Sequence, residues 1–444
     1  MIKKVKLLLE ENKLIELSEY FQTINSVDIS KIMCELDEKD LLLVFRMLPK
    51  DVVVEVFSYL EKDTQKNLIQ LITDSEIKDI IDKLFLDDTV DLIEELPAHI
   101  VKRVLKNTSS ERRNLINQFL NYKEDSAGAI MTIEFIDLKE DITALEAINI
   151  VRNKCVNKEV IDPCFVIDKN RKLIGSVSLK NLILSDEEIK VSSLIDKNII
   201  YTKTSEEQEE VANIFKEYDL TCMPVVDCEK RLVGIITVDD IIDIIEKENT
   251  EDFQKMAAIK PSEKSYLKTP VIELAKHRVV WLLVLMISAT ITGNIIKQFD
   301  DVLQSVVILA AFIPMLMDTG GNAGSQSSTL IIRGLALGDI KIRDYAKVMF
   351  KEFRVSLIVG AVLSVVNFLR IYFIERTDIR IAITVCGSLF FTVIIAKVVG
   401  SILPIIAKKL KFDPAIMASP LITTVVDAFA LMVYFTFAKV LLGI

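Results

Sequence analysis

Histidine and paired cysteines are scarce in this chain, and each shortage argues against a class of site. Only His99 and His277 are present among 444 residues, which argues against a zinc or iron site built on histidines. None of the six cysteines belongs to a C-x-x-C pair, so we expect reduced thiols rather than a metal site. The sequence has no nucleophile elbow, no Walker-type phosphate loop and no histidine-centred acid–base pair, so we do not expect an enzyme.

Charge is divided unequally along the chain. Residues 1–252 carry 52 acidic and 33 basic side chains, whereas residues 253–444 carry 12 and 21. An acidic soluble half repels phosphate, so we expect no nucleic-acid partner. Divalent cations are the natural partners of such a surface.

Glycine is absent from residues 1–127, and this region consists of short amphipathic segments. Phrases such as LLLVFRMLPKDVVVEVFSYL indicate a helix that ends at Leu-Pro and a second helix that begins just after it. The pattern predicts a helical domain over residues 1–128, built as a small α-solenoid.

A duplication follows. The phrase FVIDKNRKLIGSVSLKNLI at 165–183 returns as PVVDCEKRLVGIITVDDII at 224–242, and each copy reads strand, charged turn, strand and helix. The repeat resembles a tandem pair of cystathionine-β-synthase-type (CBS) modules, whose two copies pack face to face. We assign the pair to residues 129–246, with copies at 129–195 and 196–246. Equivalent positions are Asp168 and Asp227, Gly175 and Gly234, and Asn181 and Asp240.

A long polar connecting helix over residues 247–270 is expected to lead to an all-α membrane domain at 271–444. Five apolar segments lie near 279–297, 302–332, 345–373, 381–407 and 414–442, several long enough to cross a bilayer of about 30 Å. If the soluble half lies in the cytosol, the inner flanks carry eleven Lys and Arg residues and the outer loops four. We therefore expect a multi-pass protein of the cytoplasmic membrane with its C-terminus outside.

Asp427 is the only charged residue between Pro414 and Phe437. A carboxylate there costs about 3 kcal/mol or more if it faces lipid, so it should face a bundle interior, a hydrogen-bonding neighbour or a watery path. The second apolar segment contains PMLMDTGGNAGSQSSTLIIRG, whose small and polar residues suit close helix contacts or a hydrated cation. Asp318, within this phrase, has no assigned role.

Residues 314–334, the DPA at 413–415 and PLITTVVD at 420–427 resemble the membrane signature of the MgtE family of magnesium channels. The order of the domains is also similar over nearly the whole chain. The resemblance implies a homodimer that takes up Mg²⁺ through a pore at the dimer interface. It implies the pore residues Asp427, Asn322, Thr423 and Ser419, although some relatives have an amide at the position of Ser419.

Carboxylates in the soluble half favour sensing of cations, with a solvated acidic face as the alternative. Asp87 and Asp91 share a helix face, and four acids of the connecting helix fall within roughly 140° of arc, interrupted by Lys247 and Lys255. The resemblance to MgtE implies that regulatory Mg²⁺ binds at these positions. They are Asp87, Asp91, Gly128 (through its backbone), Glu207, Glu209, Asp219, Asp240, Asp243, Glu248, Glu251, Asp252 and Asp413.

Thr237 and Asp240 have the spacing that binds a ribose in adenosine-binding CBS modules, so ATP at the CBS pair stays an open alternative to magnesium. The function expected is a magnesium channel closed by cytosolic Mg²⁺. Two rivals remain: another CBS-containing channel or exporter, and a non-conducting membrane sensor of nucleotide or divalent ions. The order of domains argues against the first, because chloride channels and magnesium/cobalt efflux proteins place CBS modules after the membrane part.

Overall fold

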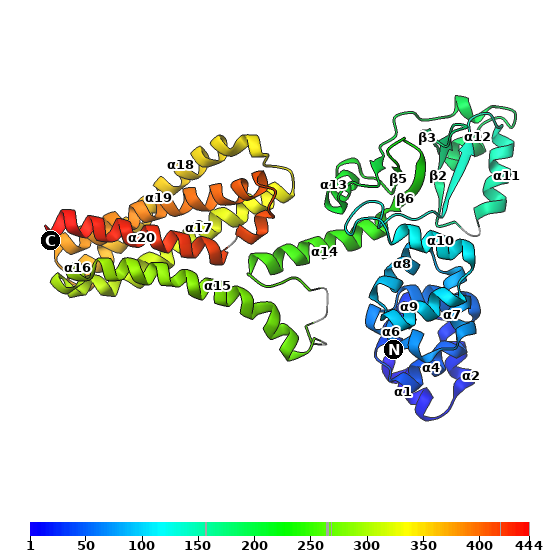
Figure 1. The fold of residues 1–444 in the computed structure, drawn as a ribbon, viewed down its shortest axis with the longest axis horizontal. Coiled ribbons are helices and arrows are strands. Elements are labelled where there is room, and N and C mark those ends of the chain that lie inside the picture. The colour runs from blue at the N-terminus through cyan, green and yellow to red at the C-terminus, as the bar shows by residue number, and fades with distance from the viewer. Residues whose placement is uncertain (156–157, 263–265, 268, 418, 444) are drawn as a thin grey trace. The chain divides into compact units, whose positions relative to one another are not determined.

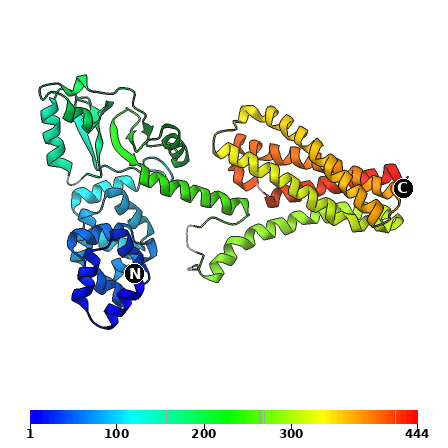
Figure 2. The same cartoon turned by 180° about the vertical axis from the view of Figure 1, so that it is seen from behind.

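The computed structural model of the chain describes residues 1–155, 158–262, 266–267, 269–417 and 419–443, without the side chains of Asp51 and Ser419. The chain forms two compact units, Met1–Ile245 and Glu246–Ile444, and each is described by itself. Both units are drawn in Figures 1 and 2.

The first unit begins with a helical array. From α3 to α10 the helices pack mainly on the helix two positions away, as α4 does on α6 and α6 on α8, which is the arrangement of a solenoid, whereas α1 packs on α2. Pro49 and Pro97 are the N-cap residues of α5 and α9, so the Leu-Pro pairs mark helix boundaries as predicted. Within residues 1–155, all described, the helices of the array are α1 (Ile2–Glu10), α2 (Leu14–Gln22), α3 (Ser26–Cys34), α4 (Glu38–Met47), α5 (Lys50–Ser58), α6 (Lys62–Leu71), α7 (Asp74–Lys83), α8 (Leu86–Glu95), α9 (Ala98–Asn107) and α10 (Ser110–Phe119).

Two small α/β modules complete the first unit, and their common topology confirms the duplication. In each module the first strand pairs parallel to the second, and the second pairs antiparallel to the third. The first module contains β1 (Phe135–Lys139), α11 (Ala144–Lys154), β2 (Val160–Ile167), β3 (Leu173–Val177) and α12 (Leu179–Leu184). The second contains β4 (Thr202–Lys203), α13 (Gln208–Tyr218), β5 (Cys222–Val226), β6 (Leu232–Thr237) and the start of α14 (Val238–Met256).

Equivalent residues of the two modules do the same structural work. Asp168 Oδ1 accepts backbone N–H bonds from Asn170 and Lys172 across the β2–β3 turn. Asp227 Oδ1 accepts the matching pair, from Glu229 and Arg231, across the β5–β6 turn. The two turns also meet, because Leu173 N–H donates to the Lys230 carbonyl and Leu232 N–H to the Arg171 carbonyl. These reciprocal bonds place the modules face to face.

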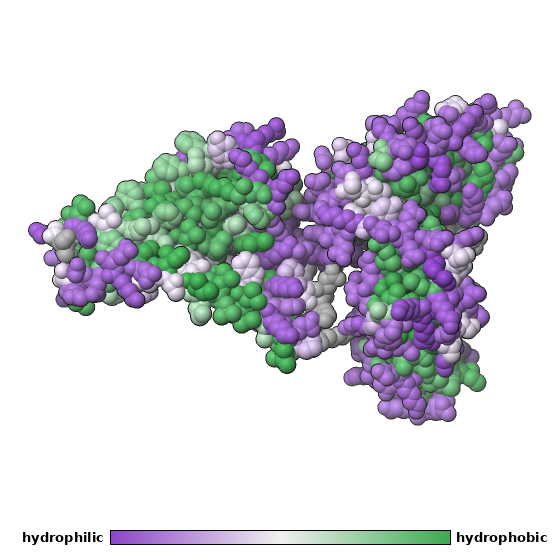
Figure 3. Space-filling model, in the orientation of Figure 1, coloured by the Kyte–Doolittle hydropathy of each residue, from purple (hydrophilic) through white to green (hydrophobic). Residues whose placement is uncertain are grey.

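The second unit holds five helical spans long and apolar enough to cross a membrane, among the residues that the structure describes. Hydrophobic residues cover the outside of these helices, whereas the first unit is largely hydrophilic at its surface (Figure 3). The spans cover Val271–Gln298, Val307–Ala336, Ile342–Ile374, Ile379–Lys409 and Pro414–Leu442. After the second half of α14, the α-helices described in this unit are α15 (Val271–Gln298), α16 (Asp300–Ser305), α17 (Ile313–Ala336), α18 (Tyr345–Leu369), α19 (Ile379–Lys409) and α20 (Ser419–Leu442).

Glycines let α17 approach two neighbours closely. A Cβ built on Gly321 would lie 2.9 Å from the Thr423 methyl group on α20. A Cβ built on Gly400 of α19 would overlap the carbonyl oxygen of Gly324. Helix α17 is therefore held between α19 and α20 by contacts that only small residues permit.

Two helix boundaries, the end of α14 and the start of α15, differ from those expected from the sequence. Helix α14 ends at Met256, because Ala258 takes a left-handed conformation (φ 54°) and Ile259 N–H bonds back to the Gln254 carbonyl. The helix thus covers only the first part of the connecting segment expected at 247–270. Helix α15 begins at Val271, after an N-cap at Pro270, so its polar first turns precede the apolar stretch.

Candidate metal centre and ion path

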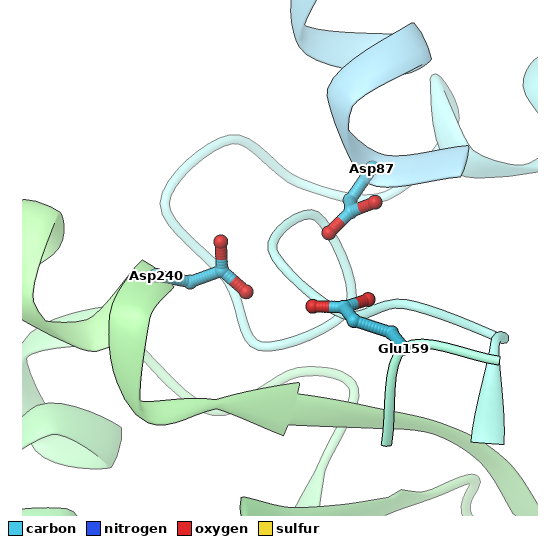
Figure 4. A group of neighbouring side chains, drawn as sticks. All are labelled: Asp87, Glu159 and Asp240. Carbon is cyan, nitrogen blue, oxygen red and sulfur yellow. The ribbon is translucent and has the colours of Figure 1, made fainter. Parts of the chain in front are cut away.

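Three carboxylates from distant parts of the sequence converge in the first unit. Asp87 lies in the first turn of α8, Asp240 in the first turn of α14, and Glu159 just before β2. Each offers an oxygen, and these oxygens all lie within 4.8 Å of one another. Figure 4 shows the three side chains pointing towards one another. This spacing suits three oxygen ligands around one divalent cation.

Two carboxylate oxygens of the group are buried without a hydrogen bond. They are Asp87 Oδ1 and Glu159 Oε2, which have no partner among the described residues. Asp240 Oδ2 accepts a hydrogen bond of 2.7 Å from Thr237 Oγ1. A buried oxygen without a donor is costly, and a bound cation would satisfy it.

Arg112 is a cation whose charge acts on Asp87. Its guanidinium is directed elsewhere, because Nη2 donates to the Leu84 carbonyl and to Thr89 Oγ1, the latter at 3.2 Å. Arg112 therefore offsets part of the negative charge at a distance and leaves the carboxylate oxygens open.

Burial and mutual repulsion raise the pKa values of this group. Burial, followed by repulsion from Asp240, raises the pKa of Glu159 to about 7 and that of Asp88, beside Asp87, also to about 7. Burial raises the pKa of Asp240 to about 6 against the opposing hydrogen bond from Thr237. Asp87 has a pKa well above its usual range, from burial and then from Asp88 and Glu159. The ionised carboxylates therefore repel one another, and a divalent cation bound between them would offset that repulsion.

Two of the other acids expected to bind Mg²⁺ lie beside this centre. Asp91, one turn after Asp87 on α8, acts electrostatically on Asp88 and Asp240. Asp243, one turn after Asp240 on α14, also acts on Asp240. Both side chains are exposed at the edge of the group.

A further set of expected ligands is divided between the two ends of α13. Glu207 is the N-cap residue, and Glu209 lies in the first turn. The Gly128 segment lies beside this end, because the Ala127 and Gly128 N–H groups donate to the Glu206 and Thr204 carbonyls. Asp219 caps the opposite end of the 11-residue helix, so one ion cannot contact both ends.

Four expected ligands belong to the second unit, where a lysine lies among them. Glu248, Glu251 and Asp252 lie on the second half of α14, and Asp413 lies between α19 and α20. Lys255 Nζ pairs with Asp413 Oδ2 at 2.6 Å and also with Glu251. Burial, then repulsion from Asp413, raises the pKa of Asp252. Lys255, which interrupts the acidic pattern of the sequence, thus forms ion pairs with two of the acids, Glu251 and Asp413.

Three of the expected pore residues lie around the contact between α17 and α20 in the membrane domain. Asp427 and Thr423 are one turn apart on α20, and Thr423 contacts Gly321 of α17, next to Asn322. The Asn322 side chain is exposed in the single chain, and Asp427 and Thr423 are half-buried. Asp318, one turn before Asn322, is exposed and close enough for its charge to act on Asp427. Ser419 is the first residue of α20, and its side chain is not among those that the structure describes.

The residues with ribose-binding spacing are bonded to each other. Thr237 is buried and donates to Asp240, which is also a member of the carboxylate centre. A nucleotide at this position would compete with that hydrogen bond and with the cation.

Sequence reasoning missed Glu159 and Asp88. Glu159 lies outside any regular pattern, and its equivalent in the second module, 59 residues on, is Tyr218, so the repeat gives no signal for it. Asp88 sits beside Asp87 and could have been found only by knowing which face of α8 meets α14. Long-range packing, not local sequence, brings these acids together.

Comparisons with known proteins agree over nearly the whole chain. The family model "Divalent cation transporter" (MgtE) matches residues 313–437, the "MgtE intracellular N domain" matches 24–125, and CBS domains match 127–187 and 191–247. The chain is 34% identical to the magnesium transporter MgtE of Thermus thermophilus over 98% of this chain and 97% of that protein. It is 32% identical to MgtE of Bacillus subtilis, over 99% and 96%.

One solved structure extends the comparison to the soluble part. The cytosolic domain of the Mg²⁺ channel MgtE in complex with ATP is similar at a TM-score of 0.52 and 31% identity. The match covers 55% of this chain and all of that one. The expected helical domain, tandem CBS pair and five membrane helices are thereby confirmed.

Proposed function

The chain belongs to the MgtE family of divalent cation transporters, and from this premise we propose that it carries Mg²⁺ across the cytoplasmic membrane as a homodimeric channel. The observation that carries the proposal is the set of polar side chains at the contact between α17 and α20. There Asp427, Thr423 and Asn322 lie around the close contact of Gly321 with Thr423, and Asn322 is exposed. Accessible polar side chains in an apolar helix bundle are the feature that an ion path requires.

The chemistry of these side chains suits a hydrated ion. Magnesium loses its waters reluctantly and keeps a tight octahedron of them. Amide and hydroxyl groups, with one carboxylate from each protomer, can hold an ion through its waters without trapping it. In this proposal Asp427 of each protomer supplies the charge, and Thr423 and Asn322 orient coordinated water. Ser419, one turn before Thr423, continues the path towards the cytosol.

Regulation by internal Mg²⁺ is assigned to the acidic groups of the soluble part and of α14. Asp87, Glu159 and Asp240 form the principal site, with Asp88, Asp91 and Asp243 around it. A cation there joins α8 of the helical array to α14 and to the first CBS module. Because such an ion binds the joined form better, it shifts the equilibrium towards that form. Helix α14 transmits the change to the membrane domain.

Two further groups of acids take part more weakly. Gly128, Glu207 and Glu209 lie around the start of α13, with Asp219 at its far end. Glu248, Glu251, Asp252 and Asp413 lie where α14 meets the membrane domain. We assign regulatory Mg²⁺ to both groups, with Lys255 as a competing cation in the second.

ATP is a second ligand proposed for the CBS pair. The support is the related cytosolic domain solved with ATP, together with Thr237 and Asp240 at the spacing that contacts a ribose. Because Asp240 also belongs to the carboxylate centre, ATP and Mg²⁺ at that residue would influence each other.

Mg²⁺ flux into liposomes that contain the purified full-length protein tests the proposal. Entry of Mg²⁺ above the rate of empty liposomes supports a transporter, whereas a non-conducting sensor gives none. The proposed topology places the soluble part in the cytosol and the C-terminus outside. A reporter fused after residue 444 should therefore be external, and one inserted at 339–341 internal.

A further inference from the structure

A buried lysine that is not among the proposed pore residues lies inside the membrane domain. Lys397 is on α19, and only 5% of its surface is exposed. It falls within a span of mean hydropathy 2.4. A buried ammonium in such a segment is costly unless it is paired, so its partners are informative.

Lys397 is one end of a hydrogen-bonded triad of side chains from three helices. Its Nζ donates to Ser327 Oγ on α17 at 3.3 Å. Ser327 Oγ lies 2.6 Å from Glu352 Oε2 on α18. A hydroxyl has one proton, so Ser327 donates it to the carboxylate and accepts from the ammonium. The triad thereby joins opposite charges through Ser327, which is 1% exposed.

The Lys397–Ser327–Glu352 triad lies beside a close contact between α17 and α19. Ser327 follows Gly324 by three residues on α17, and Lys397 precedes Gly400 by three on α19, so each pair is one turn apart. Gly324 and Gly400 are in direct backbone contact. Glycine contacts bring two helices together but have no directional bond to fix rotation or depth. The hydrogen bonds of Ser327 are directional and supply that constraint.

The constrained helix is the one that carries Asn322. The other face of α17 meets α20 through Gly321 and Thr423, and Ser328 Oγ donates to the Met417 carbonyl at 3.1 Å. A rotation of α17 would therefore move Asn322 relative to Asp427. We infer that Lys397 is a positioning residue for transport, acting through Ser327 and Glu352 to hold α17 in register. The inference rests on the proposed role of α17 and α20 in the ion path.

The test compares Mg²⁺ flux into liposomes for full-length Lys397→Met, Ser327→Ala and the double variant, with Lys409→Met as control. Lys409 is exposed on the same helix, so its loss should leave flux unchanged. Each single variant should lower the maximal rate about tenfold, because small displacements of a functional group are costly. The double variant should be no slower than Lys397→Met, because both changes disrupt the same hydrogen-bonded triad. Lys397→Gln, which keeps a donor, should recover part of the rate.

Two readouts separate positioning from general damage. The melting temperature in detergent should stay within a few degrees of wild type, and the ratio of Mg²⁺ to Ca²⁺ flux should fall. Unchanged flux in Lys397→Met, losses that multiply in the double variant, or rates that merely follow melting temperature would overturn the inference. If Lys397→Met does not fold, Ser327→Ala and Lys397→Gln decide by the same criteria. Failure of the ion path itself is recognised separately, as undiminished flux through Asp427→Ala.

Discussion

Lys255 joins α14 to the membrane domain by an ion pair with Asp413, with Nζ 2.6 Å from Oδ2. The same ammonium pairs with Glu251 one turn earlier. Burial disfavours the charged lysine, but the hydrogen bonds to Asp413 and Glu251 outweigh it and raise the pKa of Lys255. A tethered cation thus lies among acids that we assign to regulatory Mg²⁺.

Replacing Lys255 with Met should make the contact between α14 and the Asp413 segment depend more strongly on Mg²⁺. Without the ammonium, Glu251, Asp252 and Asp413 repel one another until Mg²⁺ binds between them. Limited proteolysis near residues 257–262 should be faster than in wild type without Mg²⁺, and protection should return at high Mg²⁺. Lys260→Met, which removes an exposed lysine nearby, is the matched control. Equal cleavage of wild type and Lys255→Met at every Mg²⁺ concentration would contradict this role.

Glu159→Gln should weaken Mg²⁺ binding in the first unit while relieving repulsion without Mg²⁺. One ionised ligand of the centre is lost, so the melting temperature should rise by about 2–4 °C without Mg²⁺ if about 1 kcal/mol of repulsion is removed. The stabilisation that Mg²⁺ adds should shrink. Differential scanning fluorimetry across a Mg²⁺ series measures both effects. Glu188→Gln, an exposed acid of the same module, should change neither. A wild-type Mg²⁺ response in Glu159→Gln would remove Glu159 from the site.

The carboxylate centre also predicts a pH dependence. The folded pKa values of Glu159 and Asp88 are about 7 and that of Asp240 is about 6, all above their ordinary values. A raised carboxyl pKa means that the folded state binds protons more tightly than the unfolded chain. Without Mg²⁺, this contribution therefore favours folding at about pH 4 and is lost as the pH rises through 6 to 7.

Mg²⁺ binds the ionised carboxylates, so its effect should have the opposite pH dependence. The rise in melting temperature at saturating Mg²⁺ should be larger at pH 8 than at pH 5.5. Asp87→Asn combined with Asp240→Asn should remove most of this difference. A Mg²⁺ effect that is equal at both pH values would show that these groups are not its binding site.

Gly400→Ala should destabilise the membrane domain strongly. The new methyl group would overlap the Gly324 carbonyl, and a backbone atom cannot move aside cheaply. Gly293→Ala is the matched control, because a Cβ there meets no atom within 4 Å and alanine favours the helix. We expect a loss of at least several degrees in melting temperature for the first variant and no loss for the second. Similar stability of both variants would argue against close packing of α17 on α19.

The sequence was sufficient to predict elements whose signal is local. The missing glycines and the Leu-Pro pairs indicated the helical array, the repeat indicated the two CBS modules, and apolar length indicated the membrane helices. The glycines of α17 were open to two interpretations, a helix contact or a cation site. The structure places Gly321 and Gly324 at helix contacts and leaves Asn322 exposed beside them.

Features that depend on distant contacts could not be predicted from the sequence. Glu159 joins the carboxylate centre only because β2 lies near α8 and α14 in the fold. Lys255 interrupted an acidic pattern in the sequence, but its partner Asp413 lies 158 residues away. The end of α14 depends on a left-handed alanine, a conformation that sequence patterns reserve for glycine.

In the proposed ion path, Asp427 supplies the charge that draws Mg²⁺ past the contact between α17 and α20. Mg²⁺ flux into liposomes should be measured for full-length Asp427→Ala and Asp427→Asn, with wild type and empty liposomes alongside. We expect background flux for the Ala variant and an intermediate rate for Asn, whose amide still accepts from coordinated water. Wild-type flux through a folded Asp427→Ala protein would show that Asp427 does not have this role.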